Sequence, residues 1–412
     1  MTVSAVDEYI SENEKIMMSD REALELLQLN RLREVIGYCR QKSPFYSYLP
    51  EKLSGFCDFR KIQFMTENDL SRNSGRLMLV SQSQAVRAVS DITSGTLGSP
   101  KRLYYTQDDQ QRTVEFFACG LSELIKKGGR TLIYMSSQRQ GSIGELISQA
   151  LTSIGAEPFF SDASCPFKQT AEIIAANKIT SVVAMPVTLL SLARFMKACS
   201  ITADIKNVLV SADTCSSHTE KLIAEELGCG VFPHYGSRES GFGGAVTCSA
   251  HEGMHAWENE LFFEIAAEDG SILEDGLEGE LVLTTLKRKA MPLIRYRTGD
   301  RAKIYSESCA CGSIVKRIGS IRRINAAAGA DISETDRIVF ADKNVIDCLV
   351  RRREDGLCFE ITVSSENFIT EDMKKKLSAV LPSGTELFIE ARLYDPDSER
   401  PLYQLKRSIL PQ

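Results

Sequence analysis

The sequence predicts an α/β fold: a large N-terminal domain with mainly parallel sheets covered by helices, a small β subdomain, and a small α+β C-terminal domain. From about residue 110 to 235, short apolar segments typical of buried strands alternate with segments of helical periodicity. Short strands separated by turns follow, up to about residue 306. A strand, a helix and a further strand occur after residue 320. Strand–helix alternation implies a parallel sheet.

Residues 1 to about 48 are expected to form helices, because apolar residues recur at helical spacing over 22–27 and 32–38. Lys42-Ser43-Pro44 would end the second helix. Residues 86–92 and 103–105 alternate as strands do, so the chain between them is expected to be a loop.

Polar and small residues follow the strands expected at 130–135, 181–185 and 207–211. Ligands of parallel sheets bind at the carboxyl ends of the strands. The following residues are therefore expected on one rim of the sheet: Ser136, Ser137, Pro186, Ser211, Ala212, Asp213, Tyr235 and Gly236.

The strands expected after residue 243 indicate where the β subdomain and the C-terminal domain lie in the sequence. Residues 260–265, 279–284 and 301–305 are expected as strands of the β subdomain, and 348–350, 357–363 and 386–390 as strands of the C-terminal domain, with a helix near 371–380. We therefore expect a large domain over 1–318, with its β subdomain over 243–317, and a small domain over 319–412.

Composition excludes some classes of protein. The 412 residues carry a net charge of −6, which argues against nucleic acid as the main partner. No apolar run approaches the length that a membrane-spanning helix needs, and the first residues do not resemble a signal peptide. Twelve scattered cysteines are read mostly as reduced thiols, so a cytoplasmic location is expected, without a membrane partner.

The run from Thr93 to Lys101 combines hydroxyl side chains, two glycines and a lysine. Glycines let the backbone approach a ligand closely, and hydroxyls, backbone N–H groups and a cation together can hold phosphate oxygens. A plain surface turn is the competing interpretation. The spacing differs from the G-x-x-x-x-G-K-[ST] loop.

This run resembles the phosphate-binding loop of the adenylate-forming enzymes, [ST]-[ST]-G-T-[TS]-G-x-P-K. Three further stretches follow in that family's order: Ser211-Ala212-Asp213, Tyr235-Gly236-Ser237-Arg238-Glu239, and the run from Pro292 to Asp300, similar to P-x-I-R-Y-R-T-G-D. The segment from Arg31 to Tyr46 and the run Cys309-Ala310-Cys311-Gly312 resemble the phenylacetate–CoA ligase branch.

The resemblance implies an AMP-forming acid–thiol ligase with a mobile C-terminal domain. ATP would activate a carboxylic acid, of aromatic preference, as acyl-AMP, and the thiol of CoA or of carrier-protein phosphopantetheine would accept the acyl group. Lys101 would hold the β- and γ-phosphates, Glu239 would bind Mg²⁺, and Asp300 would bind the ribose hydroxyls. The family's C-terminal lysine has Lys406 as its nearest candidate, with a solvated tail lysine as the alternative.

The remaining implied site residues form two groups. The ATP-binding candidates are Thr93, Ser94, Gly95, Thr96, Gly98, Tyr235 (near adenine), Gly236 and Arg317. The acyl-pocket candidates are Ser137, Gly141, Ala212, His234 and Gly236, with a core histidine as the competing interpretation of His234.

Three positions depart from the family pattern. Leu97 replaces a hydroxyl, Arg238 replaces the Ser/Thr before Glu239, and residues 319–324 read Gly-Ser-Ile-Arg-Arg-Ile where the family has G-R-x-D-D-[MIL]. The last departure removes an arginine that the resemblance implies at the phosphates and an aspartate about which the C-terminal domain would rotate. Arg317, Arg322 or Arg323 could replace the charge of that arginine. Two alternative functions therefore stay open: an adenylating enzyme that does not use CoA, and a non-catalytic nucleotide-binding relative. A homodimer is also left open.

A structural zinc site is a further hypothesis. Cys248 and His255 lie in the expected β subdomain, and Cys309 and Cys311 follow; soft sulfur ligands with an imidazole suit tetrahedral Zn²⁺. His251 could replace His255, and four ordinary residues are the competing interpretation.

Overall fold

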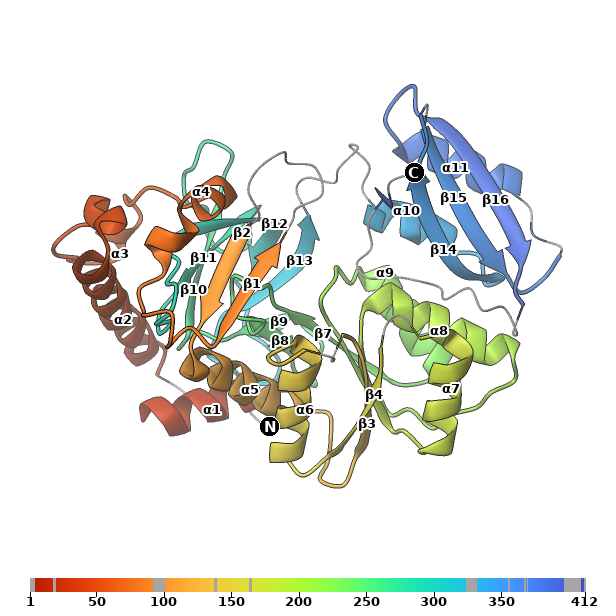
Figure 1. Cartoon of the computed structure of the whole chain (residues 1–412), viewed down its shortest axis with the longest axis horizontal. Helices are drawn as coiled ribbons and strands as arrows, with labels where there is room; N and C mark the ends of the chain where they lie inside the picture. The colour runs from red at the N-terminus through yellow and green to blue at the C-terminus, as the bar shows by residue number, and fades with distance from the viewer. Residues whose placement is uncertain are drawn as a thin grey trace. The chain divides into compact units, whose positions relative to one another are not determined.

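The structure is a computed structural model that describes residues 4–17, 20–91, 101–136, 139–162, 165–323, 332–354, 356–366, 368, 370–395 and 409–410. The chain divides into two compact units. The first comprises Met1–Leu124 and His234–Ile324, and the second comprises Ile125–Pro233 and Asn325–Gln412. Figure 1 labels their elements. Over the ranges given above, no helix is long and apolar enough to cross a lipid bilayer.

The helices of the first unit begin where the sequence offers a capping side chain. Ser4 and Asp20 each accept a hydrogen bond from a backbone N–H in the first turn that follows. Thr66 and Thr106 each form a capping box with the aspartate three residues further on. These helices are α1 (Ala5–Glu14), α2 (Arg21–Lys42), η1 (Pro44–Tyr48), α3 (Phe56–Phe59), α4 (Glu67–Leu77) and α5 (Gln107–Ser122).

The strands of the first unit are β1 (Arg87–Asp91), β2 (Lys101–Tyr105), β8 (Ala245–Thr247), β9 (Met254–Ala256), β10 (Leu261–Ala266), β11 (Glu278–Thr285), β12 (Tyr296–Ile304) and β13 (Arg317–Arg323), with the end of β7 (Gly230–Tyr235). β1 and β2 pair antiparallel with each other. The others form antiparallel pairs in the order β10-β11-β12-β13-β9-β8-β7. This register places Asp300 of β12 opposite Arg323 of β13.

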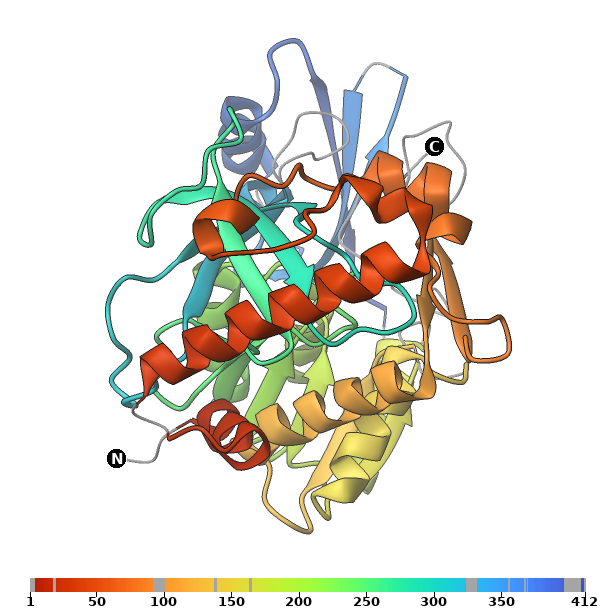
Figure 2. The ribbon, with the colours of Figure 1, turned by 90° about the vertical axis from the view of Figure 1, so that its left-hand side faces the viewer.

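The apolar core of the first unit lies between α2 and the antiparallel strands. Leu32 and Ile36 of α2 belong to the same cluster of buried side chains as Leu283 of β11. Figure 2 shows α2 lying across the strands, and Gln28 of α2 donates a hydrogen bond of 2.9 Å to the carbonyl oxygen of Glu258.

Trp257, the single tryptophan of the sequence, lies in a separate aromatic group of the first unit. It is 4% exposed and directly follows β9. Its ring centroid is 4.7 Å from that of Phe116 in α5 and 6.1 Å from that of Tyr9 in α1. The indole therefore connects both helices to the sheet.

The second unit contains a parallel sheet. Its strands are β3 (Arg130–Tyr134), β4 (Glu157–Ser161), β5 (Ser181–Ala184) and β6 (Asn207–Val210), with the start of β7, and their order is β4-β3-β5-β6-β7. Its helices are α6 (Ile143–Ser153), α7 (Phe167–Ala176), α8 (Pro186–Ala198) and α9 (Ser217–Leu227). Figure 1 shows α6 on one side of β3 and β4, with α7, α8 and α9 on the other. The sheet is therefore covered on both faces, as buried parallel strands require.

The C-terminal part of the second unit forms a small sheet of its own, in the order β16-β15-β14-β17. Its elements are α10 (Ile332–Val339), β14 (Val345–Arg352), β15 (Gly356–Val363), α11 (Thr370–Val380), β16 (Glu386–Leu393) and β17 (Ile409–Leu410). Together with the parallel sheet, this arrangement confirms the predicted fold class.

Arg194 of α8 links the C-terminal part of the second unit to helices α8 and α9. Its guanidinium, 3% exposed, donates to the carbonyl oxygens of Phe340 (2.8 Å), Asp342 (3.0 Å) and Val345 (2.7 Å). It also pairs with the buried Glu226 of α9 at 3.3 Å. The predicted division at residue 318 into a large and a small mobile domain stays a prediction.

Candidate active site and metal centre

Lys101 and Glu239 meet in the first unit although 138 residues separate them. The Nζ atom of Lys101, at the start of β2, lies 2.5 Å from Oε1 of Glu239 and 3.3 Å from Oε1 of Glu67, the first residue of α4. Lys101 and Glu239 are 6% and 8% exposed. Burial alone would raise the pKa of Glu239, but the Lys101 ammonium outweighs burial and lowers it to about 2. The carboxylate is therefore charged at neutral pH.

The turn after β7 holds Glu239 in place by backbone contacts. A Cβ at Gly236 would lie 2.1 Å from the carbonyl oxygen of Phe242, so only glycine fits this close approach. Ser237 and Ser240 exchange hydrogen bonds between side chain and backbone, at 2.9 and 3.1 Å. Arg288 donates to the carbonyl oxygen of Glu239 at 2.6 Å. The position of this carboxylate is therefore set before any ligand binds.

Asp300 and its partners form a second group of polar side chains, beside the pair of Lys101 and Glu239. Its Oδ2 accepts a hydrogen bond of 2.9 Å from the hydroxyl of Tyr235, the last residue of β7. Its Oδ1 lies 2.6 Å from Nη1 of Arg323. Burial, followed by the charge of Asp300, raises the pKa of Tyr235 well above 10, so the phenol stays protonated and keeps donating.

Tyr296 links the group of Lys101 and Glu239 with the group of Asp300 and Arg323, since it interacts with members of both. It is the first residue of β12, and its hydroxyl lies 3.4 Å from Oε1 of Glu239. The charge of Arg323 acts on both Glu239 and Tyr296. We call Lys101, Glu239, Asp300, Arg323, Tyr235, Glu67 and Tyr296 the charged cluster.

The structure brings together four of the residues that the sequence singles out: Lys101, Glu239, Asp300 and Tyr235, with Gly236 beside them. Arg317 is not among them. Its guanidinium donates to the carbonyl oxygens of Glu252 and Glu307, and it lies six residues before Arg323 on β13, about 20 Å along a strand. Thr93, Ser94, Gly95, Thr96, Gly98, Ser137 and Lys406 lie outside the described residues.

The sequence reading missed Glu67 and Tyr296 as members of the charged cluster. Glu67 lies outside every motif, and its only local signal is the N-terminal turn of a helix, where acidic residues are common. Tyr296 lies inside the run from Pro292 to Asp300, so position in a recognised motif could have indicated it.

The acyl-pocket candidates fall in both units. Gly141, with φ +66°, and Ala212, with φ +67°, belong to the second unit. His234 belongs to the first, where its ring centroid lies 5.5 Å from that of Phe116 and 5.1 Å from that of Phe117. Burial lowers the pKa of His234 to about 3, so its ring is neutral. Their role in an acyl pocket stays a prediction.

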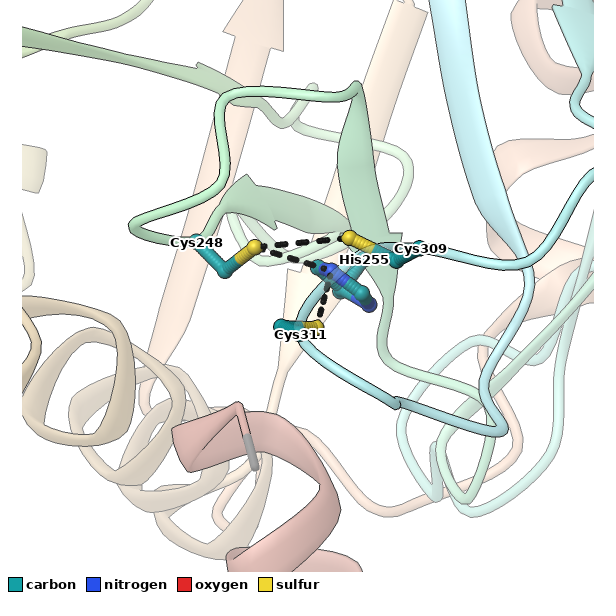
Figure 3. A group of neighbouring side chains, drawn as sticks. All are labelled: Cys248, His255, Cys309 and Cys311. Carbon is teal, nitrogen blue, oxygen red and sulfur yellow. Dashed lines mark hydrogen bonds between the residues drawn. The ribbon is translucent and has the colours of Figure 1, made fainter. Parts of the chain in front are cut away.

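The four predicted zinc ligands form one buried group in the first unit (Figure 3). One ligand atom from each of Cys248, His255, Cys309 and Cys311 lies within 4.8 Å of the others. His255 comes from β9, and Cys248 directly follows β8. A turn brings the two later cysteines, with Gly312 at φ +80°. His251 is not part of the group.

The spacing of the ligand atoms matches a tetrahedron. Sγ of Cys248 lies 3.7 Å from Sγ of Cys309 and 3.3 Å from Nε2 of His255, and Sγ of Cys311 lies 3.6 Å from the same nitrogen. Around a tetrahedral zinc, with Zn–S of about 2.3 Å and Zn–N of about 2.0 Å, two sulfurs would be about 3.8 Å apart and a sulfur and a nitrogen about 3.5 Å. Burial lowers the pKa of His255 to about 4, so the imidazole is neutral, the form that ligates metals.

No family model matches the sequence. The chain is 27% identical over 317 residues to the phenylacetate-coenzyme A ligase of Thermus thermophilus, covering 73% of this chain and 70% of that protein. It is 26% identical over 310 residues to the phenylacetate-coenzyme A ligase of Aromatoleum evansii, covering 71% and 69% of the two chains.

A solved structure of 2-hydroxyisobutyryl-CoA ligase, in the postadenylation state in complex with R3-HIB-AMP, shares the fold. Its TM-score is 0.75 at 18% identity, covering 93% of this chain and 88% of that one. The resemblance predicted from the motifs is therefore confirmed: this chain is similar in sequence to phenylacetate–coenzyme A ligases and shares the fold of an acyl-CoA ligase.

Proposed function

We propose that this protein is an AMP-forming acid–thiol ligase that activates an aromatic carboxylic acid with ATP and passes the acyl group to CoA. In the first step a carboxylate oxygen attacks the α-phosphorus and pyrophosphate leaves, which gives acyl-AMP. In the second step the sulfur of the thiol attacks the acyl carbon, the thiol proton is lost, and AMP leaves. The meeting of Lys101, Glu239 and Asp300 in one charged cluster carries the proposal, with the sequence relatives in support.

The charged cluster suits a nucleotide because each of its charged side chains could exchange its present partner for a part of ATP. Lys101 would release Glu239 and hold the β- and γ-phosphates while pyrophosphate leaves. Glu239 would hold Mg²⁺, which prefers carboxylate oxygens and supplies charge neutralisation on the phosphates when bound. Asp300 would accept hydrogen bonds from the ribose hydroxyls, since each carboxylate oxygen has a second lone pair free beside Tyr235 or Arg323.

Exchange of labelled pyrophosphate into ATP, over a panel of aryl and short-chain acids, tests the first step. We expect exchange with aryl acids and, once CoA is added, net AMP release with formation of the thioester. Exchange that CoA does not convert into thioester would point to a carrier-protein thiol or to an acceptor other than a thiol. ATP binding without exchange for any acid would contradict the proposal and favour a non-catalytic relative.

We propose that Cys248, His255, Cys309 and Cys311 hold one structural Zn²⁺. The four atoms leave no fifth ligand group in the described part of the chain, as in closed structural sites. Protein purified without added zinc should contain one zinc per chain by elemental analysis. Cys309→Ser should lose the metal and about 3 kcal/mol of stability, which lowers Tm by about 6–12 °C in a unit of this size.

Cys57→Ser is the matched control for the zinc experiment, because Cys57 is exposed and outside the cluster. It should keep both the metal and the Tm. Less than stoichiometric metal in the wild-type protein would contradict the zinc proposal. A cytoplasmic location stays a proposal from the sequence; all twelve cysteines lie in the described part of the chain, and none of them is paired in a disulfide.

A further inference from the structure

Three arginines of β13 could supply the cation that the resemblance expects at the phosphates, and the structure separates them. Arg317 is 4% exposed, and its donors are held by carbonyl oxygens near the metal centre. Arg322 pairs with Glu278 at 2.7 Å, and both side chains are exposed. Arg323 alone of the three reaches the charged cluster, where it pairs with Asp300 at 2.6 Å.

Arg323 has both the freedom and the surroundings of a residue that can change partner. Its side chain is 59% exposed, whereas that of Asp300 is 9% exposed, so the guanidinium enters the cluster from solvent. Besides Asp300 it makes one long contact, 3.4 Å to the carbonyl oxygen of Thr298. The charge of Glu239 also acts on it. No other element described here locks this side chain in place.

The position of Arg323 is also where a nucleotide needs charge. If Asp300 binds the ribose and Lys101 with Glu239 binds the outer phosphates, the α-phosphate lies between them, because it joins these parts of ATP covalently. Arg323 pairs with Asp300, at one end of that span, and the charge of Glu239, at the other end, also acts on its guanidinium. A guanidinium can donate to a carboxylate and a phosphate at once through its several N–H groups.

We propose that Arg323 is a catalytic residue of the adenylation site: it is paired with Asp300 in the free protein and donates to the α-phosphate of the bound nucleotide. The proposal rests on the proposed function and names the residue that replaces the arginine missing at Ser320. The same contact would stabilise the charge that develops on the α-phosphate oxygens when the acid attacks.

Comparison of AMP with adenosine isolates the phosphate contact. Calorimetry on the full chain should show that Arg323→Ala lowers the ratio of AMP affinity to adenosine affinity by about 10- to 100-fold, as expected for charge-assisted hydrogen bonds. Arg323→Lys should restore part of this ratio. Arg322→Ala, at the neighbouring exposed position, should leave the ratio within twofold of wild type.

The outcomes separate this proposal from its competitors. If Arg323 only positions Asp300, Arg323→Ala weakens AMP and adenosine equally, the ratio stays constant, and the proposal is wrong. If Arg323 only obstructs the site, both ligands bind more tightly at a constant ratio, which also overturns it. A wild-type protein that binds neither ligand overturns it too. A falling ratio together with absent pyrophosphate exchange would leave the Arg323 contact standing and remove the proposed ligase activity.

Discussion

Lys101→Ala should lower the rate of pyrophosphate exchange by about 10²- to 10³-fold, the usual effect of removing one preorganised donor from a developing negative charge. The lysine is nearly inaccessible, and it pairs with two carboxylates, Glu239 and Glu67. Burial lowers its pKa, but the charge of Glu239 outweighs burial and raises it, so the ammonium is charged throughout the neutral range. Removing it takes away the cation nearest the proposed magnesium carboxylate.

Arg102→Ala is the control for this experiment, because Arg102 is the next residue of β2 and is exposed. It should keep wild-type exchange. Lys101→Met retains much of the apolar stem, and it should show the same loss if Lys101→Ala folds poorly. Circular dichroism checks the fold of each variant. Wild-type exchange in a folded Lys101 variant would remove Lys101 from the proposed site.

Arg194→Ala should destabilise the second unit by about 3–5 kcal/mol, the range for breaking a buried ion pair by removing one partner. The substitution leaves Glu226 buried and removes the donor from three carbonyl oxygens between residues 340 and 345. Hydrogen exchange of the amides in β14 and β15 measures this loss locally, which matters because a chain of two units need not unfold in one step.

Lys197→Ala tests whether burial is the reason for the large effect. Lys197 pairs with the same carboxylate, Glu226, at 2.8 Å, but its own side chain is 69% exposed. Its loss should change stability by no more than about 0.5 kcal/mol. Equal losses in the two variants would show that the three carbonyl contacts of Arg194 contribute little.

Most strands and helices of the fold could be predicted because each carries its own periodicity, but β4 could not. Its residues Glu157–Ser161 include Pro158, which normally argues against a strand. β4 pairs only with β3, at the edge of its sheet, so a missing backbone N–H costs it no pairing on the outer side. Edge position is a property of the assembled sheet and has no local signal.

The candidate site was predictable only where motifs exist. Lys101, Glu239 and Asp300 stand in recognisable runs, so their chemistry could be proposed before their proximity was known. The choice among Arg317, Arg322 and Arg323 depends on the pairing of β12 with β13, which sets Asp300 opposite Arg323. The sequence alone does not distinguish the three arginines within these seven residues. Only the register of β13 against β12 shows which of them faces Asp300.

The single tryptophan gives each unit a different optical signature. Trp257 is buried in the first unit, two residues from the proposed zinc ligand His255, and the second unit has no indole. Intrinsic fluorescence excited at the indole band therefore reports on the first unit alone. Removal of the metal or unfolding around β9 can be followed without any label, whereas the backbone signal reports on both units together.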